Sequence, residues 1–295
     1  MKQFYGTGIA IVTPFKEDFS IDHEALASIV DYNIKNGVDY IVICGTTGES
    51  VTTTREEKKQ LVATINEANN NRVPMVYGIG GNNTQAVIEE IKTTDLSLME
   101  GLLSVSPYYS KPQQEGIYQH FKAVGKASPI PVILYNVPGR TSSNMLPETT
   151  LRLAKDVDNI VAVKEAGNNV AQYLKLLQHK PEDFLILSGD DDLALGVILA
   201  GGAGVISVIG QGLPKEFTSM VNLGLVGKAT EAYKYHFDLM DLTSLIFKEN
   251  NPAGIKGVLS QLGYCRDTVR LPLVPATDSL KVEIRTALKK LNYIN

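Results

Sequence analysis

The stretch that decides the fold reads Ile160-Val161-Ala162-Val163-Lys164-Glu165-Ala166, a series of β-branched and apolar residues that ends on a lysine. A short apolar run of this kind predicts a buried strand. Side chains alternate between the two faces of a strand, so Ile160, Ala162 and Lys164 are expected on one face. Val161 and Val163 are expected on the other. Because lysine is rarely fully buried, Lys164 needs either a partner or a chemical role.

Two interpretations of Lys164 follow from its place at the end of the strand. Its side chain could form a structural ion pair with a nearby carboxylate. Alternatively, burial of a lysine favours the neutral amine, which is a nucleophile that condenses with a carbonyl compound to give a Schiff base. The heptapeptide alone favours the ion pair, and the rest of the chain reverses this preference.

The composition is typical of a soluble globular protein. The chain has 295 residues, of which 44% are hydrophobic and 20% charged, and its net charge is −4. Lysine and arginine are scattered rather than clustered, which argues against nucleic acid or an anionic membrane as a partner. Residues 193–213 carry no charge but contain six glycines, so we expect a helix, a turn and a buried strand there rather than a membrane span.

The cysteines and the N-terminal residues point to the cytoplasm. Cys44 and Cys265 are far apart in the sequence and form neither a metal-binding nor a redox pattern. No signal peptide is evident in the first residues. We therefore expect two reduced thiols in a cytoplasmic protein.

Apolar, β-rich runs recur at regular intervals along most of the chain. They lie at residues 8–13, 39–44, 73–79, 101–106, 131–135, 160–164, 184–188 and 204–208. A helical pattern follows each run; one opens with the capping-box sequence Thr54-Arg55-Glu56-Glu57, and Pro147 suits the first turn of another. Eight strand–helix units in about 225 residues predict a closed (β/α)₈ TIM barrel. An open doubly wound sheet is the alternative, but its dinucleotide fingerprint is missing, as is a P-loop.

Strand patterns stop after residue 225. Residues 229–247, 252–262 and 279–291 look helical instead. We expect a small C-terminal helical region at residues 228–295, packed against a catalytic barrel formed by residues 1–227.

Reactive side chains gather where the expected strands end. In barrel enzymes the chemistry takes place at this C-terminal face of the barrel. The strand ends read Gly45-Thr46-Thr47-Gly48-Glu49-Ser50, Ser106-Pro107-Tyr108-Tyr109, Tyr135-Asn136-Val137-Pro138-Gly139-Arg140, Lys164 and Ser188-Gly189-Asp190-Asp191-Asp192. Hydroxyls, phenols, a guanidinium and an amine are therefore expected around one mouth.

Most of these segments also have a purely structural interpretation. Residues 45–50 form either an ordinary turn or a cradle of N–H groups and hydroxyls for a carboxylate. The pair Tyr108-Tyr109 serves either packing or catalysis. Arg140 binds either a loop carboxylate or, in bidentate fashion, a substrate carboxylate. For residues 190–192 we favour a cluster of helix N-cap residues.

Metal and phosphate chemistry are poorly supported by the sequence. The four histidines fall in expected helices or at their edges, and no His-Glu-x-x-His pattern occurs, so no metal site is expected. A phosphate-binding barrel usually has a glycine-rich loop after strands seven and eight. Gly201-Gly202 precedes the eighth strand, whereas Gly210-Gln211-Gly212 follows it. A phosphate site is therefore weakened but not excluded.

In their order along the chain, these motifs resemble those of the dihydrodipicolinate synthase family of pyruvate-dependent class I aldolases. The matching stretches are Ala10-Ile11-Val12-Thr13-Pro14-Phe15, residues 45–50, 106–109, 135–141, 163–166, 188–191 and 204–208, and Arg270-Leu271-Pro272-Leu273. Each motif alone is weak, but the ordered set covers almost the whole chain. The resemblance implies an enzyme that forms homotetramers and needs no cofactor beyond a covalent Schiff base with its substrate pyruvate.

The resemblance also implies catalytic roles for five residues. Lys164 would form the Schiff base, and the carboxylate of pyruvate would rest on Thr46 and Thr47. Tyr135, Thr46 and Tyr109 would form a proton relay, with Tyr109 supplied by a neighbouring subunit. A hydrogen-bonded relay is chemically reasonable because a lone phenol is a poor base at neutral pH.

A second substrate, L-aspartate 4-semialdehyde, is implied as well, with its carboxylate held by Arg140. Backbone groups at Gly189 and Ile206 would line the pocket, and the product would supply lysine and diaminopimelate biosynthesis. Two alternatives remain. One is another aldolase of the superfamily, such as an N-acetylneuraminate or keto-sugar-acid lyase, and the other is a non-catalytic ligand sensor that reuses the barrel.

The sequence departs from part of the family at the site where lysine inhibits some bacterial members. Three positions of that site are retained, as Ser50, Asn82 and Tyr108. Two positions that hold histidine in many such members are Arg55 and Lys58, and a glutamate position is Ala86. Two added cations and a lost carboxylate repel a cationic ligand, so we expect weak or absent inhibition by lysine.

Overall fold

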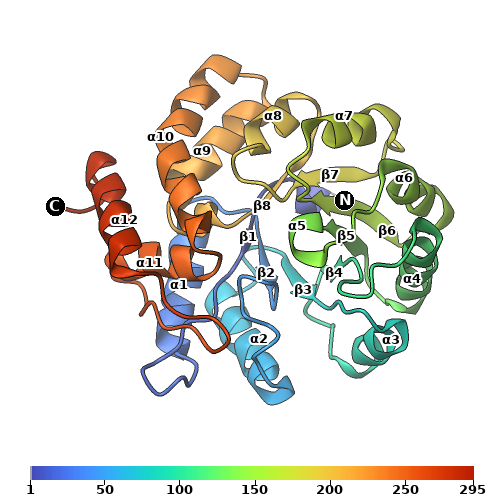
Figure 1. Ribbon diagram of the computed structural model, residues 1–295, viewed down its shortest axis with the longest axis horizontal. Coiled ribbons are helices and arrows are strands. Elements are labelled where there is room, and N and C mark those ends of the chain that lie inside the picture. The colour runs from blue at the N-terminus through green and yellow to red at the C-terminus, as the bar shows by residue number, and fades with distance from the viewer. Residues whose placement is uncertain (1) are drawn as a thin grey trace.

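A closed barrel of parallel strands forms the centre of the protein (Figure 1). The computed structural model describes residues 2–295. Within these residues eight strands follow one another around the barrel in chain order, and β1 closes it by pairing with β8. The strands are β1 (Gly6–Ala10), β2 (Tyr40–Ile43), β3 (Met75–Gly78), β4 (Gly101–Val105), β5 (Val132–Asn136), β6 (Ile160–Glu165), β7 (Leu185–Ser188) and β8 (Gly204–Ser207). The predicted (β/α)₈ barrel is confirmed.

Helices surround the barrel as the sequence predicted (Figure 1). They are α1 (His23–Lys35), α2 (Arg55–Asn69), α3 (Thr84–Thr93), α4 (Gln114–Ala127), α6 (Pro147–Asp156), α7 (Val170–His179), α8 (Ala194–Leu199) and α9 (Pro214–Leu225). Local signals set two of their starts. Thr54 and Glu57 form the predicted capping box of α2, and Pro147 occupies the first turn of α6. The short helix α5 (Pro138–Thr141), which follows β5 directly, was not predicted from the sequence.

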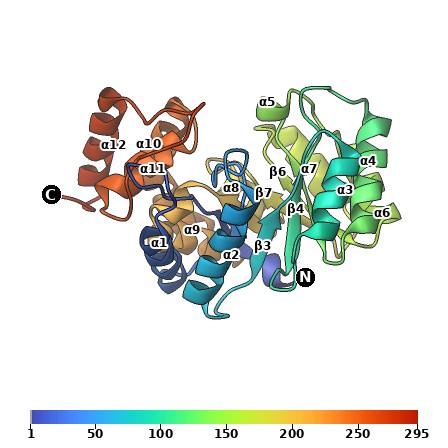
Figure 2. The same ribbon diagram turned by 90° about the horizontal axis from the view of Figure 1, so that it is seen from below.

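Three further helices, α10 (Ala229–Lys248), α11 (Ala253–Gln261) and α12 (Asp278–Lys290), follow the barrel. We call these helices and their connecting loops the C-terminal helices. Figure 2 shows them beside the barrel, toward the same end as α5. Residues 193–213 form α8, a turn and β8, as expected. Within residues 2–295, no helix combines the length and apolarity that crossing a membrane requires.

Two apolar clusters, one inside the barrel and one between the strands and helices, form the core. Val42, Ile133 and Leu187 belong to the inner cluster. Ile41 and Ile186, which neighbour two of these residues in sequence, belong to the outer cluster. This alternation is the one that a strand buried on both faces requires.

Strand β6 departs from strict alternation. Its pairing with β5 skips Val161, which marks a β-bulge. As a result, Val161 joins the inner cluster and Ile160 the outer one. The expectations that Ile160 shares a face with Lys164 and that Val161 lies on the opposite face are therefore wrong, whereas Ala162 and Val163 lie on their expected faces.

Candidate active site

A cavity of about 360 Å³ opens where the carboxyl ends of the strands meet. It brings together most of the residues that the sequence singled out. Its lining includes Thr46, Thr47, Tyr135, Arg140, Lys164 and Gly189. The loop before α11 also reaches this cavity through Asn251. The reactive groups after β2, β5, β6 and β7 therefore share one enclosure, as predicted for a barrel.

Lys164 is buried at the floor of this cavity, with 5% of its surface exposed. The pairing of β5 with β6 sets it opposite Tyr135, and its Nζ atom lies 4.4 Å from the centroid of the Tyr135 ring. None of the ion pairs within residues 2–295 includes Lys164. The interpretation of Lys164 as one half of a structural ion pair is therefore wrong for the described chain.

The absence of a side chain at Gly189 leaves room for the side chain of Lys164. A Cβ atom at position 189 would come within 2.9 Å of Lys164 Cε and within 2.6 Å of Ala166 Cβ. Any larger residue at position 189 would have to displace the lysine side chain or the backbone of β6. The close approach explains why the loop after β7 needs a glycine here.

The loop after β2 carries two adjacent hydroxyl groups into the cavity. Thr46 is exposed, while Thr47 is buried, and its Oγ1 atom accepts a hydrogen bond of 2.9 Å from Asn251 Nδ2. Because the amide donates to this oxygen, the hydroxyl proton of Thr47 is free to be donated to another acceptor. Such a pair of hydroxyls beside backbone N–H groups suits a carboxylate.

Arg140, on α5, lies at the rim of the cavity and is exposed. Its Nη2 atom donates to Asn250 Oδ1 at 3.2 Å and to the carbonyl oxygen of Asn251 at 3.3 Å. No ion pair within the described residues involves it, so the interpretation of Arg140 as a partner of a loop carboxylate is wrong. The remaining N–H groups of the guanidinium can bind an anion.

The three aspartates after β7 line the same cavity and cap no helix. Helix α8 begins at Ala194, and its N-cap makes no side-chain hydrogen bond. Instead, Asp191 is buried and accepts the N–H groups of Val208 and Ile209 at 3.0 and 2.9 Å. Burial raises the pKa of the Asp191 carboxyl to about 6. The favoured N-cap interpretation is wrong because the backbone donors come from the distant loop after β8.

Glu165 directly follows the lysine and is fully buried on the opposite face of β6. Asn136 Nδ2 donates to its two carboxyl oxygens at 3.0 and 2.9 Å, and Gln172 Nε2 donates to one of them at 2.9 Å. Burial raises the pKa of Glu165 to about 7 despite these donors. No local sequence pattern indicates these contacts, because Asn136 lies on β5 and Gln172 on α7.

Two residues to which the resemblance assigns roles in the site, Tyr109 and Ile206, do not line the cavity. Tyr109 has 88% of its surface exposed and lies outside the set of lining residues. Tyr108 instead lines a neighbouring cavity of about 560 Å³, together with Ser50 and Lys58. Ile206 is fully buried in the interior of the barrel, and Val208 lines the cavity above it.

The glycine-rich segment after β8 is occupied by internal contacts. The N–H groups of Gly210 and Gly212 donate to Ser207 Oγ and to the Ile209 carbonyl, at 2.7 and 2.8 Å. The buried amide of Gln211 bonds the backbone of β1 and of the residues after it. These donors are therefore not available for a phosphate. Within residues 2–295, no group of three or more His, Cys, Asp or Glu side chains is arranged to hold a metal ion.

Known proteins resemble this chain along its whole length. The sequence profile of the dihydrodipicolinate synthetase family matches residues 3–291. A 4-hydroxy-tetrahydrodipicolinate synthase of Flavobacterium psychrophilum is 58% identical over 292 residues, which cover 99% of this chain and 100% of that protein.

Solved structures agree. The dihydrodipicolinate synthase of Thermotoga maritima has a TM-score of 0.96 and 36% identity, covering 99% of this chain and 100% of that one. A chloride-inhibited dihydrodipicolinate synthase of Acinetobacter baumannii, complexed with pyruvate, has a TM-score of 0.95 and 36% identity, covering 98% and 99%. The chain therefore belongs to the dihydrodipicolinate synthetase family.

Proposed function

We propose that this protein is a 4-hydroxy-tetrahydrodipicolinate synthase, a lyase that condenses pyruvate with L-aspartate 4-semialdehyde for lysine and diaminopimelate biosynthesis. The observation that carries the proposal is the position of Lys164. Its amine is buried at the floor of the cavity, forms no ion pair within the described residues, and faces a phenol ring. A buried lysine that faces the cavity and forms no ion pair is placed as the nucleophile that a class I aldolase needs.

The first chemical step joins Lys164 to pyruvate. The amine attacks the C2 carbonyl carbon, and the resulting carbinolamine takes up one proton and loses one water to give a protonated Schiff base. Loss of a proton from the methyl carbon then gives an enamine, whose electron pair can form a carbon–carbon bond. Because the lysine itself acts as the electron sink, the reaction needs no cofactor beyond this covalent bond.

Thr46, Thr47 and Tyr135 surround the position that pyruvate takes. The free hydroxyl protons and the backbone N–H groups of the loop after β2 hold its carboxylate. Tyr135 lies beside the amine and passes protons in a relay with Thr46 and with Tyr109 of a neighbouring subunit. The support for these roles is that Thr46, Thr47 and Tyr135 line the cavity that contains the amine.

The second substrate, the semialdehyde, binds next to this enamine. Its aldehyde carbon is attacked by the enamine carbon, and the aldehyde oxygen takes up a proton. Arg140 binds the carboxylate of the semialdehyde, since its guanidinium faces the cavity and is anchored only by neutral groups. The amine of the semialdehyde then displaces Lys164 from C2, which closes the ring and regenerates the enzyme. Backbone groups at Gly189 and beside Ile206 line the site.

In this proposal the active form is a homotetramer in the cytoplasm. Assembly is needed because Tyr109 does not line the cavity of its own chain. Tyr109 has a positive φ of 68° and is exposed, a costly arrangement for an isolated surface residue. Val51, which is also exposed, lines the neighbouring cavity together with Tyr108. A second subunit that covers this surface would bring its own Tyr109 to the site.

A comparison of substrates tests the proposal. We expect the turnover of pyruvate with L-aspartate 4-semialdehyde to exceed the cleavage of N-acetylneuraminate by orders of magnitude, because Arg140 selects a short carboxylate substrate. Lys164→Ala should abolish both activities. A preference for the sugar acid would assign the cavity to a keto-sugar-acid lyase, and no turnover of either would leave the ligand-sensor alternative.

A further inference from the structure

A buried ion pair connects the loop after β2 with the C-terminal helices. Glu49 Oε1 and Lys256 Nζ are 2.5 Å apart, and their side chains are 1% and 0% exposed. Lys256, on α11, also donates to the carbonyl oxygen of Thr268 at 2.8 Å and lies 4.3 Å from the centre of the Phe15 ring. Desolvation lowers the pKa of Lys256, and the carboxylate of Glu49 opposes this shift.

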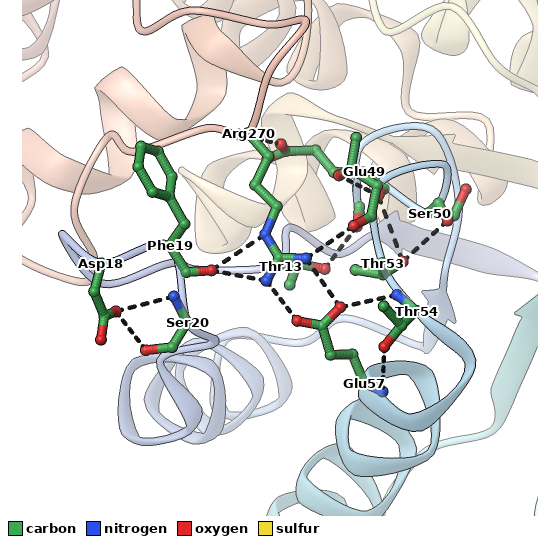
Figure 3. A network of polar contacts seen from close by, with 12 residues as sticks. Thr13, Asp18, Phe19, Ser20, Glu49, Ser50, Thr53, Thr54, Glu57 and Arg270 are labelled. Carbon is green, nitrogen blue, oxygen red and sulfur yellow. Dashed lines mark hydrogen bonds and ion pairs between the residues drawn. The ribbon is translucent and has the colours of Figure 1, made fainter.

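Arg270, in the loop between α11 and α12, holds the loop after β2 from a second side. The N–H group of Arg270 donates to Glu49 Oε2 at 2.9 Å, so both carboxyl oxygens of Glu49 are bound by the C-terminal helices. The guanidinium of Arg270 forms two hydrogen bonds to Glu57 and another to the carbonyl oxygen of Thr52, at 2.8 Å (Figure 3). The chain from Glu49 to Glu57 is thereby fixed at both ends.

This loop carries the proposed pyruvate site. Glu49 lies two residues after Thr47, and its own φ is 53°, a conformation that costs free energy in a residue other than glycine. Asn251, which precedes α11, adds the hydrogen bond to Thr47 Oγ1. The C-terminal helices therefore contact the loop at Thr47, at Glu49 and, through Arg270, at Thr52.

Stability alone does not account for this pair. Desolvating two charges is costly, and replacement of a buried ion pair by apolar groups is often neutral or stabilising. A buried pair is more effective at fixing one geometry, because any displacement of the loop leaves a charge unpaired. The geometry fixed here is that of the two hydroxyls that receive a carboxylate.

We propose that Glu49 is a positioning residue for the pyruvate reaction: its buried contacts with Lys256 and Arg270 hold Thr46 and Thr47 in the arrangement that binds the keto-acid carboxylate. The inference rests on the proposed function. The C-terminal helices, which contribute no residue to the Schiff-base chemistry, thus control the affinity for the first substrate. Arg140, which determines the affinity for the second substrate, is held by Asn250 and Asn251 rather than by Glu49.

The decisive variant is the double substitution Glu49→Gln/Lys256→Met, which removes both charges together. Glu49→Gln alone leaves a buried ammonium group unpaired and lowers the stability of the protein. In the double variant we expect circular dichroism to show a folded protein. The KM for pyruvate should increase at least about tenfold, which corresponds to the loss of one charge-assisted hydrogen bond. The KM for the semialdehyde should stay within about twofold of wild type, a split that loss of stability alone does not produce.

Lys281→Met is the matched control. Lys281 forms an ion pair with Asp267 at 2.6 Å within the C-terminal helices but does not contact the loop after β2. It should leave both KM values unchanged. If the double variant does not fold, Arg270→Met decides, because this side chain is partly exposed and holds the same loop.

An unchanged KM for pyruvate in the folded double variant, or in Arg270→Met where the double variant does not fold, overturns the inference. A wild-type enzyme without activity on pyruvate would instead overturn the proposed function.

Discussion

Lys164 and Tyr135 face each other across neighbouring strands, with the Nζ atom of the lysine 4.4 Å from the centroid of the tyrosine ring. The register of β5 and β6 sets this relationship, so it belongs to the rigid part of the barrel. In the proposed mechanism, the phenol is therefore beside the atom that would form the Schiff base.

We predict that Tyr135→Phe lowers kcat by about 10²- to 10³-fold, the usual contribution of a positioned acid–base group. The phenyl ring keeps its packing beside Lys164, so pyruvate should still be trapped covalently, only more slowly. Steady-state kinetics and the rate of trapping separate the two effects. A kcat within a few-fold of wild type would remove Tyr135 from the relay.

Mixing two inactive variants tests whether Tyr109 serves a neighbouring subunit. Lys164→Ala lacks the nucleophile, and Tyr109→Phe lacks the phenol. In a mixed oligomer, a site with the lysine of one chain and the tyrosine of the other is complete. Co-expression of the two chains with different affinity tags should restore roughly one site in four, as expected for random pairing across a two-fold interface.

The matched control is the mixture of Lys164→Ala with Lys164→Ala/Tyr109→Phe, which should stay inactive. If Tyr109 acted within its own chain, no mixture would exceed the residual activity of Tyr109→Phe. The experiment therefore reports on the assembly and the relay together.

Glu165 predicts a dependence of stability on pH. Burial raises its pKa from 4.5 to about 7 in the folded protein. Between these values the folded state binds a proton that the unfolded state lacks, so the stabilisation is complete below about pH 4.5 and is lost as the pH rises through 7. A shift of this size corresponds to about 3 kcal/mol.

We expect Glu165→Gln to flatten the decrease in Tm between pH 5 and pH 8, because the amide does not titrate. The other buried carboxyls are unchanged in this variant, so the comparison with wild type isolates Glu165. Glu67→Gln, an exposed substitution on α2, serves as the control. Parallel profiles for wild type and Glu165→Gln would show that Glu165 does not titrate in this range.

Inhibition by lysine is predicted to be weak, although the structure modifies the reason. Lys58 lines the 560 Å³ cavity with Ser50 and Tyr108 and forms an ion pair of 3.5 Å with Glu90. Arg55 donates instead to Thr93 and does not line this cavity. The repulsion of a cationic ligand therefore comes from Lys58 and is partly offset by Glu90, which lines the same cavity.

Activity measured with lysine below the millimolar range should be close to that without it, and Lys58→His/Ala86→Glu should increase the sensitivity. Strong inhibition of the wild-type enzyme in this range would contradict the prediction.

Local signals explain how much of the fold was predictable. The capping box at Thr54 and the proline at position 147 are signals carried by neighbouring residues, and they correctly predicted where α2 and α6 begin. The bulge at Val161 depends on the register with β5, which no local pattern contains. The division between barrel and C-terminal helical region at residue 227 stays a prediction.

The candidate site followed the same rule. Lys164, Tyr135 and Thr46 were found because barrel strand ends point to one mouth. Asn251 and Lys256 were missed because each meets its partner across more than 200 residues of chain. The aspartates after β7 were misread because Asp190 and Asp191 accept from backbone N–H groups after β6 and after β8. Contacts between residues that are far apart in the sequence are therefore the part of the site that could not be predicted.

The most direct measurement is reduction with borohydride in the presence of pyruvate, followed by mass spectrometry of the intact chain and its peptides. We predict one covalent adduct per chain, on Lys164, with the mass of pyruvate less one water plus two hydrogens, and no adduct in Lys164→Ala. A wild-type chain that stays unmodified, or an adduct on another lysine, would contradict it.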